Sequence, residues 1–340
     1  MERACRGIGV SAGMGLAAGL LAVLGFFGPV PSAQAEEVRV TMDWKIKGTH
    51  APYYVALKKG YFKSEGLDIA ISQGAGSVKA VQFVGSGQFQ FASADFGTMA
   101  KGVIRGIPVR AIFAVKQLSP MAIIALPKSG IKTLADLKGK RLAVSAGDST
   151  SQILPGLMAK NNIPPGSFTL ITTAPASKIP ALLEGKVDAM TGYTSNQLPI
   201  VKSRVAKQGI EPVSLRYSDY GVNLLANGII TQEDLVQKNP DRVRAFLRAA
   251  KKGWEDAIRD RKGALNVVFE YFPQSKKQSF VFSEQLDEVI RLMDSPSTKG
   301  KPMGWMARPD WVETVDLLKK YAGVKGDVPV ERLYTNALIP

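Results

Sequence analysis

Apolar residues occur in short, strand-like runs that alternate with helix-like stretches through the first two-thirds of the chain. In the first run, residues 38–42, apolar side chains stand at alternate positions, which is the period of a strand with one buried face. Strands that alternate with short helices favour a mainly parallel sheet covered by helices on both faces. The expected strands are residues 38–44, 66–72, 89–94, 109–116, 141–145, 168–173, 187–192 and 212–216, and the expected helices are 51–59, 78–85, 98–105, 133–136, 152–161, 178–183 and 196–207.

The alternating pattern restarts at an apolar run bounded by Pro120 and Pro127, and we place a first crossing between two lobes there. A second crossing is expected around residues 220–230, after which long helix-like stretches follow. These helices are expected to wrap the first lobe; they are residues 240–259, 285–293 and 308–321. The predicted organisation is 36–120 for the first part of lobe 1, 121–222 for lobe 2 and 223–340 for the second part of lobe 1.

Two stretches of the sequence echo each other, residues 84–92 and residues 182–190. Each reads as the end of a helix, a glycine turn and a strand, with Gly87 matching Gly185, Phe89 matching Val187 and Gln90 matching Asp188. The echo supports two lobes built on one plan, and chance similarity between two βα units is the alternative.

Polar and aromatic residues crowd the stretch 43–62, directly after the first expected strand. Thr49 is a candidate N-cap of the next helix, Pro52 fits its first turn and Gly60 fits its end. The stretch therefore lies at the carboxyl end of a strand and beside a helix N-terminus, where open α/β sheets bind ligands. The candidate ligand contacts are Trp44, His50, Tyr53 and Tyr54. The alternative for each is a place in the hydrophobic core.

Two further loops that open helices are rich in glycine and hydroxyl residues. Gly76 and Ser77 can offer backbone N–H groups in the first half, and Gly147, Ser149 and Thr150 can do so in the second. Such loops suit an anionic oxygen. The first loop lacks the third glycine of a dinucleotide fingerprint and the lysine of a P-loop, which argues against nucleotide binding.

Asp95 and Asp148 also fall at these loops, and a carboxylate there repels an anion. A ligand that carries N–H donors as well as an acceptor or anionic end would satisfy both features. The alternative role for each aspartate is to cap a helix.

The first 35 residues are interpreted as a secretory signal peptide. Arg3 and Arg6 precede a mostly apolar stretch, and Ala33-Gln34-Ala35 is a small-x-small site that predicts cleavage after Ala35. The alternative is a retained membrane anchor, against which the glycine and proline residues before Ala33 argue. The mature chain is therefore expected in the periplasm.

The composition excludes several kinds of site. The only cysteine, Cys5, lies within the expected signal peptide, so the mature chain has no disulfide or thiolate metal site. A single histidine likewise excludes a histidine-rich metal centre. No metal or cofactor is expected.

The formal charge of +15 is typical of proteins that bind nucleic acid. The basic residues are spread along the chain, however, and no block of five or six appears. A solvated basic surface is the preferred interpretation, and no nucleic-acid partner is expected.

No catalytic set is visible in the sequence. A serine hydrolase needs a histidine base beside its nucleophile. His50 is the single candidate base, and no serine in a nucleophile elbow accompanies it. An enzyme that uses His50 as acid or base stays open as an alternative to a binding protein.

A set of motifs in this order resembles the solute-binding proteins of ABC importers, in the branch for nitrate, taurine and alkane sulfonates, and thiamine pyrimidine precursors. The motifs run from about residue 38 to residue 247 and include Asp43-Trp44, Gly48-Thr-His50-Ala-Pro-Tyr-Tyr54, Lys59-Gly-Tyr-Phe62, Gly74-Ala-Gly-Ser77, Ala94-Asp95, Gly106-Ile-Pro-Val109, Leu134-Ala-Asp-Leu-Lys-Gly-Lys140 and Gly147-Asp-Ser-Thr150. The resemblance implies the two-lobed periplasmic-binding-protein fold of type II, an α/β fold whose cleft closes on one ligand.

The same resemblance implies a set of ligand-binding residues on both sides of the cleft. Those of the first lobe are Trp44, His50, Tyr54, Gly76, Ser77 and Asp95, and those of the second are Gly147, Asp148, Ser149, Thr150, Tyr193 and Asn196. Asp-Trp followed by histidine is most similar to the pyrimidine-precursor members, although Lys45-Ile46-Lys47 stands where they usually carry Thr/Tyr-Pro-Asn. Fungal enzymes of the superfamily rely on a cysteine-rich metal motif, which the mature chain lacks.

These observations predict a monomeric periplasmic receptor that delivers a small ligand to an ABC permease. A pyrimidine-like or other aromatic heterocycle is favoured as the ligand, with an alkane sulfonate, taurine or nitrate as the alternative. A sensory protein that feeds a membrane receptor would use the same cleft, and the sequence does not separate it from transport.

Overall fold

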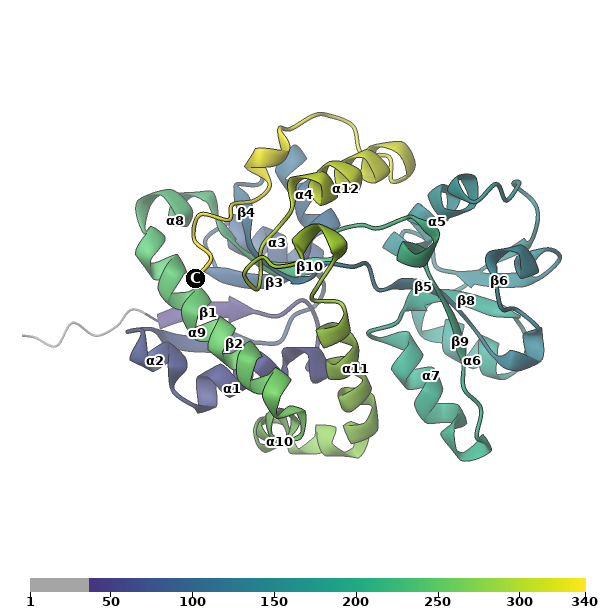
Figure 1. Ribbon diagram of the computed structural model, residues 1–340, viewed down its shortest axis with the longest axis horizontal. Helices are drawn as coiled ribbons and strands as arrows, with labels where there is room; N and C mark the ends of the chain where they lie inside the picture. The colour runs from purple at the N-terminus through teal and green to yellow at the C-terminus, as the bar shows by residue number, and fades with distance from the viewer. Residues whose placement is uncertain (1–36) are drawn as a thin grey trace, which may run out of the picture. The chain divides into compact units, whose positions relative to one another are not determined.

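The computed structural model describes residues 37–340, which contain two five-stranded sheets (Figure 1). The predicted signal peptide and its cleavage site lie outside the described residues. We call the first sheet with its helices, residues 37–116 and 227–340, the first lobe, and residues 121–216 the second lobe. Residues 117–120 and 217–226 connect them.

The first sheet has the strand order β2-β1-β3-β10-β4. Four of its strands run in one direction, and β10 pairs antiparallel with both β3 and β4. The strands are β1 (Glu37–Thr41), β2 (Asp68–Ser72), β3 (Phe91–Asp95), β4 (Val109–Lys116) and β10 (Asn227–Gln232).

The second sheet repeats this plan in the order β7-β6-β8-β5-β9, with β5 as its antiparallel strand. Its strands are β5 (Met121–Ala125), β6 (Arg141–Val144), β7 (Thr169–Thr172), β8 (Ala189–Tyr193) and β9 (Val213–Arg216). In each sheet the antiparallel strand directly follows a connection between the lobes. The expected mainly parallel α/β sheets are confirmed, and the one reversed strand in each is a feature that the hydrophobic pattern did not predict.

The echo between the two halves of the sequence corresponds to equivalent structure. Gly87 and Gly185 both have positive φ, at 80° and 74°. Downstream of these turns, Gln90 Oε1 accepts a hydrogen bond from the N–H of Arg39 at 2.8 Å, and Asp188 Oδ2 accepts one from the N–H of Arg141 at 2.8 Å. The two side chains therefore join the same pair of strands in each lobe, β1 to β3 and β6 to β8.

The helices of the described residues flank these sheets (Figure 1). Those of the first half are α1 (Ala51–Lys58), α2 (Tyr61–Ser64), α3 (Ser77–Gly85) and α4 (Phe96–Ile104), and those of the second lobe are α5 (Ser149–Lys160), α6 (Lys178–Leu183) and α7 (Gln197–Val205). The helices of the last third are α8 (Glu233–Lys238), α9 (Pro240–Arg259), α10 (Arg261–Tyr271), α11 (Ser279–Arg291) and α12 (Arg308–Tyr321).

The late helices cover the first lobe as expected, but two of them also reach the second. Trp254 of α9 packs edge-on against Tyr53 of α1, with ring centroids 6.1 Å apart. On α11, Glu284 forms an ion pair with Lys202 of α7 at 3.0 Å. Tyr321 of α12 lies over Gly156 of α5. Helices α11 and α12 therefore also contact the second lobe, which the hydrophobic pattern did not predict.

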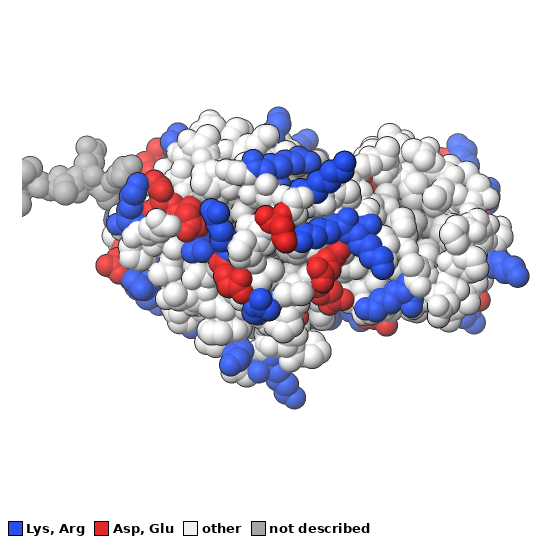
Figure 2. Space-filling view, turned by 90° about the horizontal axis from the view of Figure 1, so that it is seen from above, with Lys and Arg blue, Asp and Glu red and all other residues white. Residues whose placement is uncertain are grey.

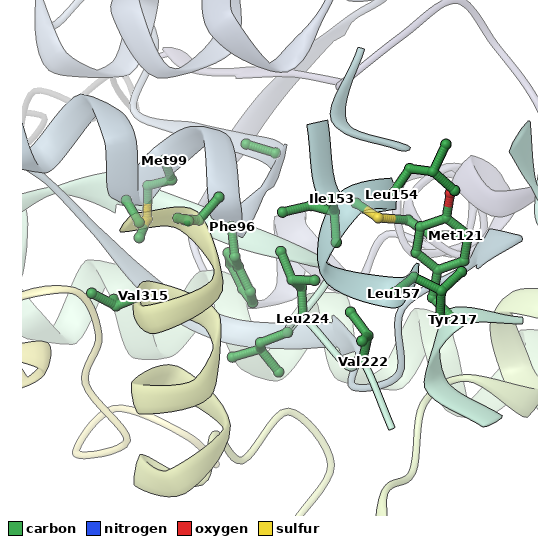
Figure 3. Packing of buried hydrophobic residues seen from close by; sticks show 14 of the residues in the cluster. Phe96, Met99, Met121, Ile153, Leu154, Leu157, Tyr217, Val222, Leu224 and Val315 are labelled. Atoms are coloured by element: carbon green, nitrogen blue, oxygen red, sulfur yellow. The ribbon is translucent and has the colours of Figure 1, made fainter. Parts of the chain in front are cut away.

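One apolar cluster is continuous between the two lobes (Figure 3). It joins Phe96 and Met99 of α4 to Ile153 and Leu157 of α5. The connecting segment between β9 and β10 contributes its own buried side chains, which are Tyr217, Val222, Leu224 and Leu225. The two connections are also bonded to each other, because the N–H of Ser119 donates to Asn223 Oδ1 at 2.8 Å. The lobes thus share a packed base beside their connections.

Within residues 37–340, no helix has the length and apolar character needed to cross a bilayer. On the face that Figure 2 shows, basic and acidic side chains are interspersed. This face has no continuous basic tract of the kind that follows a nucleic-acid backbone.

Candidate functional site

The polar residues of the first lobe gather at one edge of its sheet. Asp43 follows β1, Asp95 ends β3 and Lys116 ends β4. Asn227 begins the reversed strand β10 and pairs with both Asp95 and Lys116 in the sheet register. Because paired residues of neighbouring strands project their side chains to the same face, these groups from distant parts of the sequence form one surface.

Asp43 and His50 form a buried hydrogen-bonded pair within this surface. His50 Nε2 lies 2.7 Å from Asp43 Oδ1, and Lys47 Nζ lies 3.0 Å from Asp43 Oδ2. Burial raises the pKa of the Asp43 carboxyl, but the charge of Lys47 and the hydrogen bond from His50 outweigh it and hold this pKa well below its usual range. Asp43 is therefore a carboxylate, and Nε2 is the protonated nitrogen of His50.

Burial also lowers the pKa of His50, and its hydrogen bond to Asp43 offsets this only in part. The ring is therefore neutral at pH 7, which leaves Nδ1 as a hydrogen-bond acceptor. Nδ1 is buried and has no partner among the described residues.

A small polar cavity of about 10 Å³ lies at this pair. Its volume is that of about one water molecule. Tyr53 and Trp254 line this cavity. The hydroxyl of Tyr53 and Nε1 of Trp254 are buried and have no hydrogen-bond partner among the described residues. The remaining lining residues are Asp43, Thr49, His50, Ser93, Val115, Lys116, Asn227 and Val289.

Trp44, Gly76, Ser77 and Asp95 continue the surface beside the cavity. The N–H of Gly76 donates to the carbonyl of Asp43 at 3.0 Å, and the N–H of Asp95 donates to Ser77 Oγ at 3.0 Å. Asp95 Oδ1 in turn accepts from the N–H of Thr98 at 2.7 Å and so caps α4. Burial raises the pKa of Asp95, and the hydrogen bonds from Thr98 counter this only partly. The capping alternative for Asp95 is thus the role that the structure shows.

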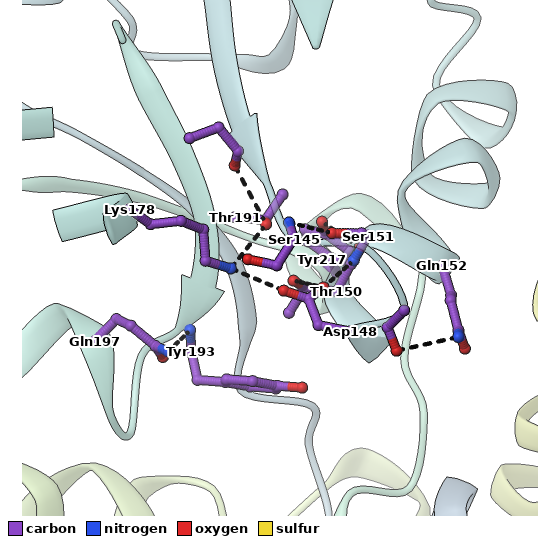
Figure 4. A network of polar contacts seen from close by, with 12 residues as sticks. Ser145, Asp148, Thr150, Ser151, Gln152, Lys178, Thr191, Tyr193, Gln197 and Tyr217 are labelled. Carbon is purple, nitrogen blue, oxygen red and sulfur yellow. Dashed lines mark hydrogen bonds and ion pairs between the residues drawn. The ribbon is translucent and has the colours of Figure 1, made fainter. Parts of the chain in front are cut away.

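Asp148 caps the corresponding helix of the second lobe, α5 (Figure 4). Its Oδ1 accepts from the N–H of Ser151 at 2.7 Å and from Thr150 Oγ1 at 2.8 Å, and its Oδ2 lies 2.8 Å from Lys178 Nζ. Burial raises the pKa of Asp148, but the hydrogen bonds from Lys178 and Ser151 hold it below its usual value. Lys178, with a 2% exposed side chain, neutralises the aspartate that was expected to repel an anion.

Tyr193 of the second lobe is affected by charged groups of both lobes. It ends β8, and its N–H donates to Gln197 Oε1 at 3.1 Å. Burial and then the charges of Asp95 and Asp148, one from each lobe, raise the pKa of its phenol well above the usual range. Tyr193 therefore stays a neutral hydrogen-bonding group that interacts with Ser149.

A direct bond also joins the lobes, because Lys101 Nζ of α4 donates to Gln152 Oε1 of α5 at 2.8 Å. Gln152 Nε2 donates to the carbonyl of Gly147 at 3.2 Å, which links this contact to the glycine loop that precedes α5.

The structure does not bring every predicted residue into this group. Tyr54 is 3% exposed and packs against Tyr271 and Phe272, with ring centroids 5.2 Å away in each case. Its neighbour Tyr53 is equally buried but lines the polar cavity. Asn196 precedes α7 and forms no side-chain cap. For Tyr54, the core alternative is the role that these contacts support.

Sequence reasoning missed three polar residues of the group. Lys116 and Asn227 stand where buried strands end and begin, and a charged residue at the end of an apolar run is a weak signal of their position. Lys178 carried no local signal, because its partner Asp148 lies thirty positions earlier.

The model of the NMT1/THI5 like family matches residues 47–264, which is more than half of the chain and includes most of this surface. The chain belongs to this family. The resemblance drawn from the motifs is thereby confirmed.

Relatives of this NMT1/THI5-like chain include binding proteins and enzymes. It is 26% identical over 324 residues to the riboflavin-binding protein RibY of Chloroflexus aurantiacus, covering 92% of this chain and 89% of that protein. It is 24% identical to a formylaminopyrimidine-binding protein of Halalkalibacterium halodurans, over 88% and 90% of the two chains. It is also 27% identical to the 4-amino-5-hydroxymethyl-2-methylpyrimidine phosphate synthase THI13 of Saccharomyces cerevisiae, over 70% and 72%.

Among solved structures, the periplasmic aliphatic sulphonate binding protein SsuA of Escherichia coli superposes with a TM-score of 0.68 at 15% identity, over 89% of this chain and 93% of that one. At this identity the likeness concerns the fold. The NMT1/THI5-like chain has the periplasmic-binding-protein fold that its motifs implied.

Proposed function

We propose that this chain is the substrate-binding protein of an ABC importer, which captures a small organic ligand between its two lobes and delivers it to a membrane permease. The family and the fold support this role, since similar proteins of comparable length bind riboflavin and formylaminopyrimidine. Export to the periplasm, a permease partner and a monomeric state belong to the same proposal.

The observation that carries the proposal is the meeting of polar groups from both lobes beside the start of α5, where Lys101 Nζ of the first lobe donates to Gln152 Oε1 of the second at 2.8 Å. The charges of Asp95 and Asp148, one from each lobe, also raise the pKa of Tyr193. The two segments that connect the lobes are hydrogen-bonded to each other, and the lobes share a packed base. That arrangement allows a hinge motion that opens the polar side while the base stays closed.

The ligand class that we favour is a neutral aromatic heterocycle. Two carboxyl groups, Asp43 and Asp95, lie at the first-lobe surface, and the lysine of the second lobe is paired with Asp148. The charges of these carboxyl groups would offset much of what an anion gains from Lys116 at the same surface. Trp44, with 49% of its surface exposed, offers a ring face for stacking beside Gly76.

A sulfonate, taurine or nitrate is the second candidate. Helix α5 of the second lobe begins with Ser149 and Thr150, and backbone N–H groups at a helix N-terminus suit an anionic oxygen. The charge of Asp148 at this point is already balanced by Lys178, so it no longer argues against an anion there.

We propose binding without turnover. The relatives that are synthases keep a catalytic role open for His50, and the Asp43–His50 pair has the form of a base with its orienting carboxylate. Ser93 lines the same cavity, but its Oγ lies 3.4 Å from Asn227 Oδ1 and no bond joins it to His50 among the described residues.

The test is to purify residues 37–340, identify any small molecule released on gentle denaturation by mass spectrometry, and titrate the emptied protein calorimetrically. Riboflavin, 4-amino-5-hydroxymethyl-2-methylpyrimidine, taurine and nitrate are the probes. Saturable binding of a probe that is recovered unchanged supports the proposal. Conversion of a bound heterocycle that His50→Gln abolishes would make the chain an enzyme, and failure of all the probes, with no molecule released, contradicts the proposed role.

A further inference from the structure

Lys116 is a largely buried cation without a hydrogen-bonded partner among the residues that the structure describes. The residue is 7% exposed and lines the cavity, and its ammonium is not fully enclosed, in contrast to His50 Nδ1. The charges of Lys47, Asp43 and Asp95 shift the pKa of Lys116. The charge of Lys116 in turn lowers the pKa of His50. A buried charge without a hydrogen-bonded partner is costly, so an acceptor supplied from outside the chain would stabilise it.

His50 presents the opposite need in the same cavity. Its Nε2–H is committed to Asp43 at 2.7 Å, and its Nδ1 is an unpaired buried acceptor. Lys116 and His50 both line the cavity of about 10 Å³, which has room for one functional group and not for a ring. The surface therefore offers a donor and an acceptor to the edge of a larger molecule.

We propose that Lys116 and His50 together read one edge of the ligand, with the ammonium donating to an acceptor atom and His50 Nδ1 accepting from the N–H beside it. Heterocycles present this pair as a lactam, O=C–N–H, or as an amino-substituted ring, N=C–NH₂. A sulfonate offers acceptors alone. The inference rests on the proposed binding function and narrows it to a ligand class.

The experiment compares probes that differ only at this edge. Riboflavin and N3-methylriboflavin test the lactam form, and 4-amino-5-hydroxymethyl-2-methylpyrimidine and its dimethylamino analogue test the amino form. The protein is residues 37–340, and affinity is measured by titration calorimetry. For at least one pair we expect the unmethylated probe to bind about tenfold more tightly or better, because methylation leaves Nδ1 unpaired.

Protein variants test the donor. Lys116→Met is expected to weaken binding of the preferred probe by about tenfold or more, as loss of a charged donor does. Lys79→Met is the matched control, since Lys79 is exposed on α3 of the same lobe, and it should bind within about twofold of the wild type. The unliganded Lys116→Met protein should melt no lower than the wild type, because it loses an unpaired buried charge. A structural role for Lys116 would instead lower the melting temperature.

A pH series adds an independent readout. Burial and the charge of Lys47 lower the pKa of Lys116 to about 8. Binding by the wild type should therefore weaken as the pH rises above about 8, and binding by Lys116→Met should not follow this dependence.

The outcomes separate the inference from the function on which it rests. Probe binding that methylation and Lys116→Met leave unchanged overturns the inference and keeps a binding protein. If taurine binds tightly and none of the heterocyclic probes binds, the inference is also overturned. The ligand of the proposed importer would then be a sulfonate. If the wild-type chain binds none of the probes and releases no molecule, both the inference and the proposed binding function are contradicted.

Discussion

Trp44 keeps 49% of its surface exposed, although Tyr53 and Tyr54 are each 3% exposed. Its ring lies beside Gly76, where a Cβ would come within 3.8 Å of Trp44 Cζ3. We expect Trp44→Ala to weaken heterocycle binding by about 1–3 kcal/mol, in line with stacking of bases on aromatic side chains. Phe280→Ala, at a side chain with 48% exposure on α11, is the matched control. Equal calorimetric affinity for both variants and the wild type would remove Trp44 from the site.

His50 is the only histidine of the chain, so its titration can be followed without overlap. Burial lowers its pKa in the folded state. The stability that neutral His50 contributes is therefore present above its unfolded pKa of about 6.5 and is lost as the pH falls below that value. NMR of the imidazole nitrogens should show a pKa below about 6.5 and a proton on Nε2 at neutral pH. A pKa above 6.5 would contradict the neutral pair.

Urea unfolding gives the matching stability measurement. Between pH 6.5 and 5, the wild type should lose stability more steeply than His50→Gln, which lacks the titrating ring; each unit of pKa difference corresponds to about 1.4 kcal/mol. Parallel pH dependences for the two proteins would show that His50 does not carry this effect.

At the scale of secondary-structure elements, local pattern predicted most strands and helices but not how they meet. The expected strand 89–94 begins at Phe91 because Phe89 instead stacks on Phe83 of α3, with ring centroids 5.5 Å apart. Tyr53 and Tyr54 looked alike in sequence. Contacts with α9 and α10, about 200 positions later in the chain, determine which of the two tyrosines reaches the polar cavity.

In the candidate site, too, local pattern predicted single residues but not the distant residues that they contact. The capping aspartates were predictable, since an acidic residue before a helix is a local signal. The positions of Lys116 and Asn227 were not, because the strand order that brings them together depends on β10 entering its sheet in reverse. Lys178 was missed because its partner Asp148 is distant in sequence.

The packing of α5 against α12 gives a prediction for a pair of elements. A Cβ added at Gly156 would lie 2.7 Å from two ring carbons of Tyr321. We expect Gly156→Ala to destabilise the fold by about 1–3 kcal/mol, the usual range for overpacking. In a double-mutant cycle, Tyr321→Leu should recover part of this loss. Additive urea-unfolding free energies for the two changes would show that the ring adjusts freely.

At the scale of the whole molecule, the apolar cluster holds the lobes at their base, and polar contacts join them elsewhere. Lys101 and Gln152 bond across the lobes at 2.8 Å, and Lys202 pairs with Glu284 at 3.0 Å. Each such contact is worth about 0.5–1.5 kcal/mol. A few of them suffice to bias a two-state equilibrium between lobe arrangements without fixing it.

Lys101→Ala should therefore shift the unliganded protein toward separated lobes and weaken ligand affinity by up to about tenfold, since affinity scales with the fraction of competent molecules. Residues 37–340 contain no cysteine, so dyes can be attached at cysteines replacing the exposed residues Lys79 of α3 and Leu170 of β7. Energy transfer between them should rise when riboflavin or another bound probe is added, and Lys101→Ala should lower the transfer before ligand is added. An unchanged signal in both comparisons would mean that the lobes do not move on binding.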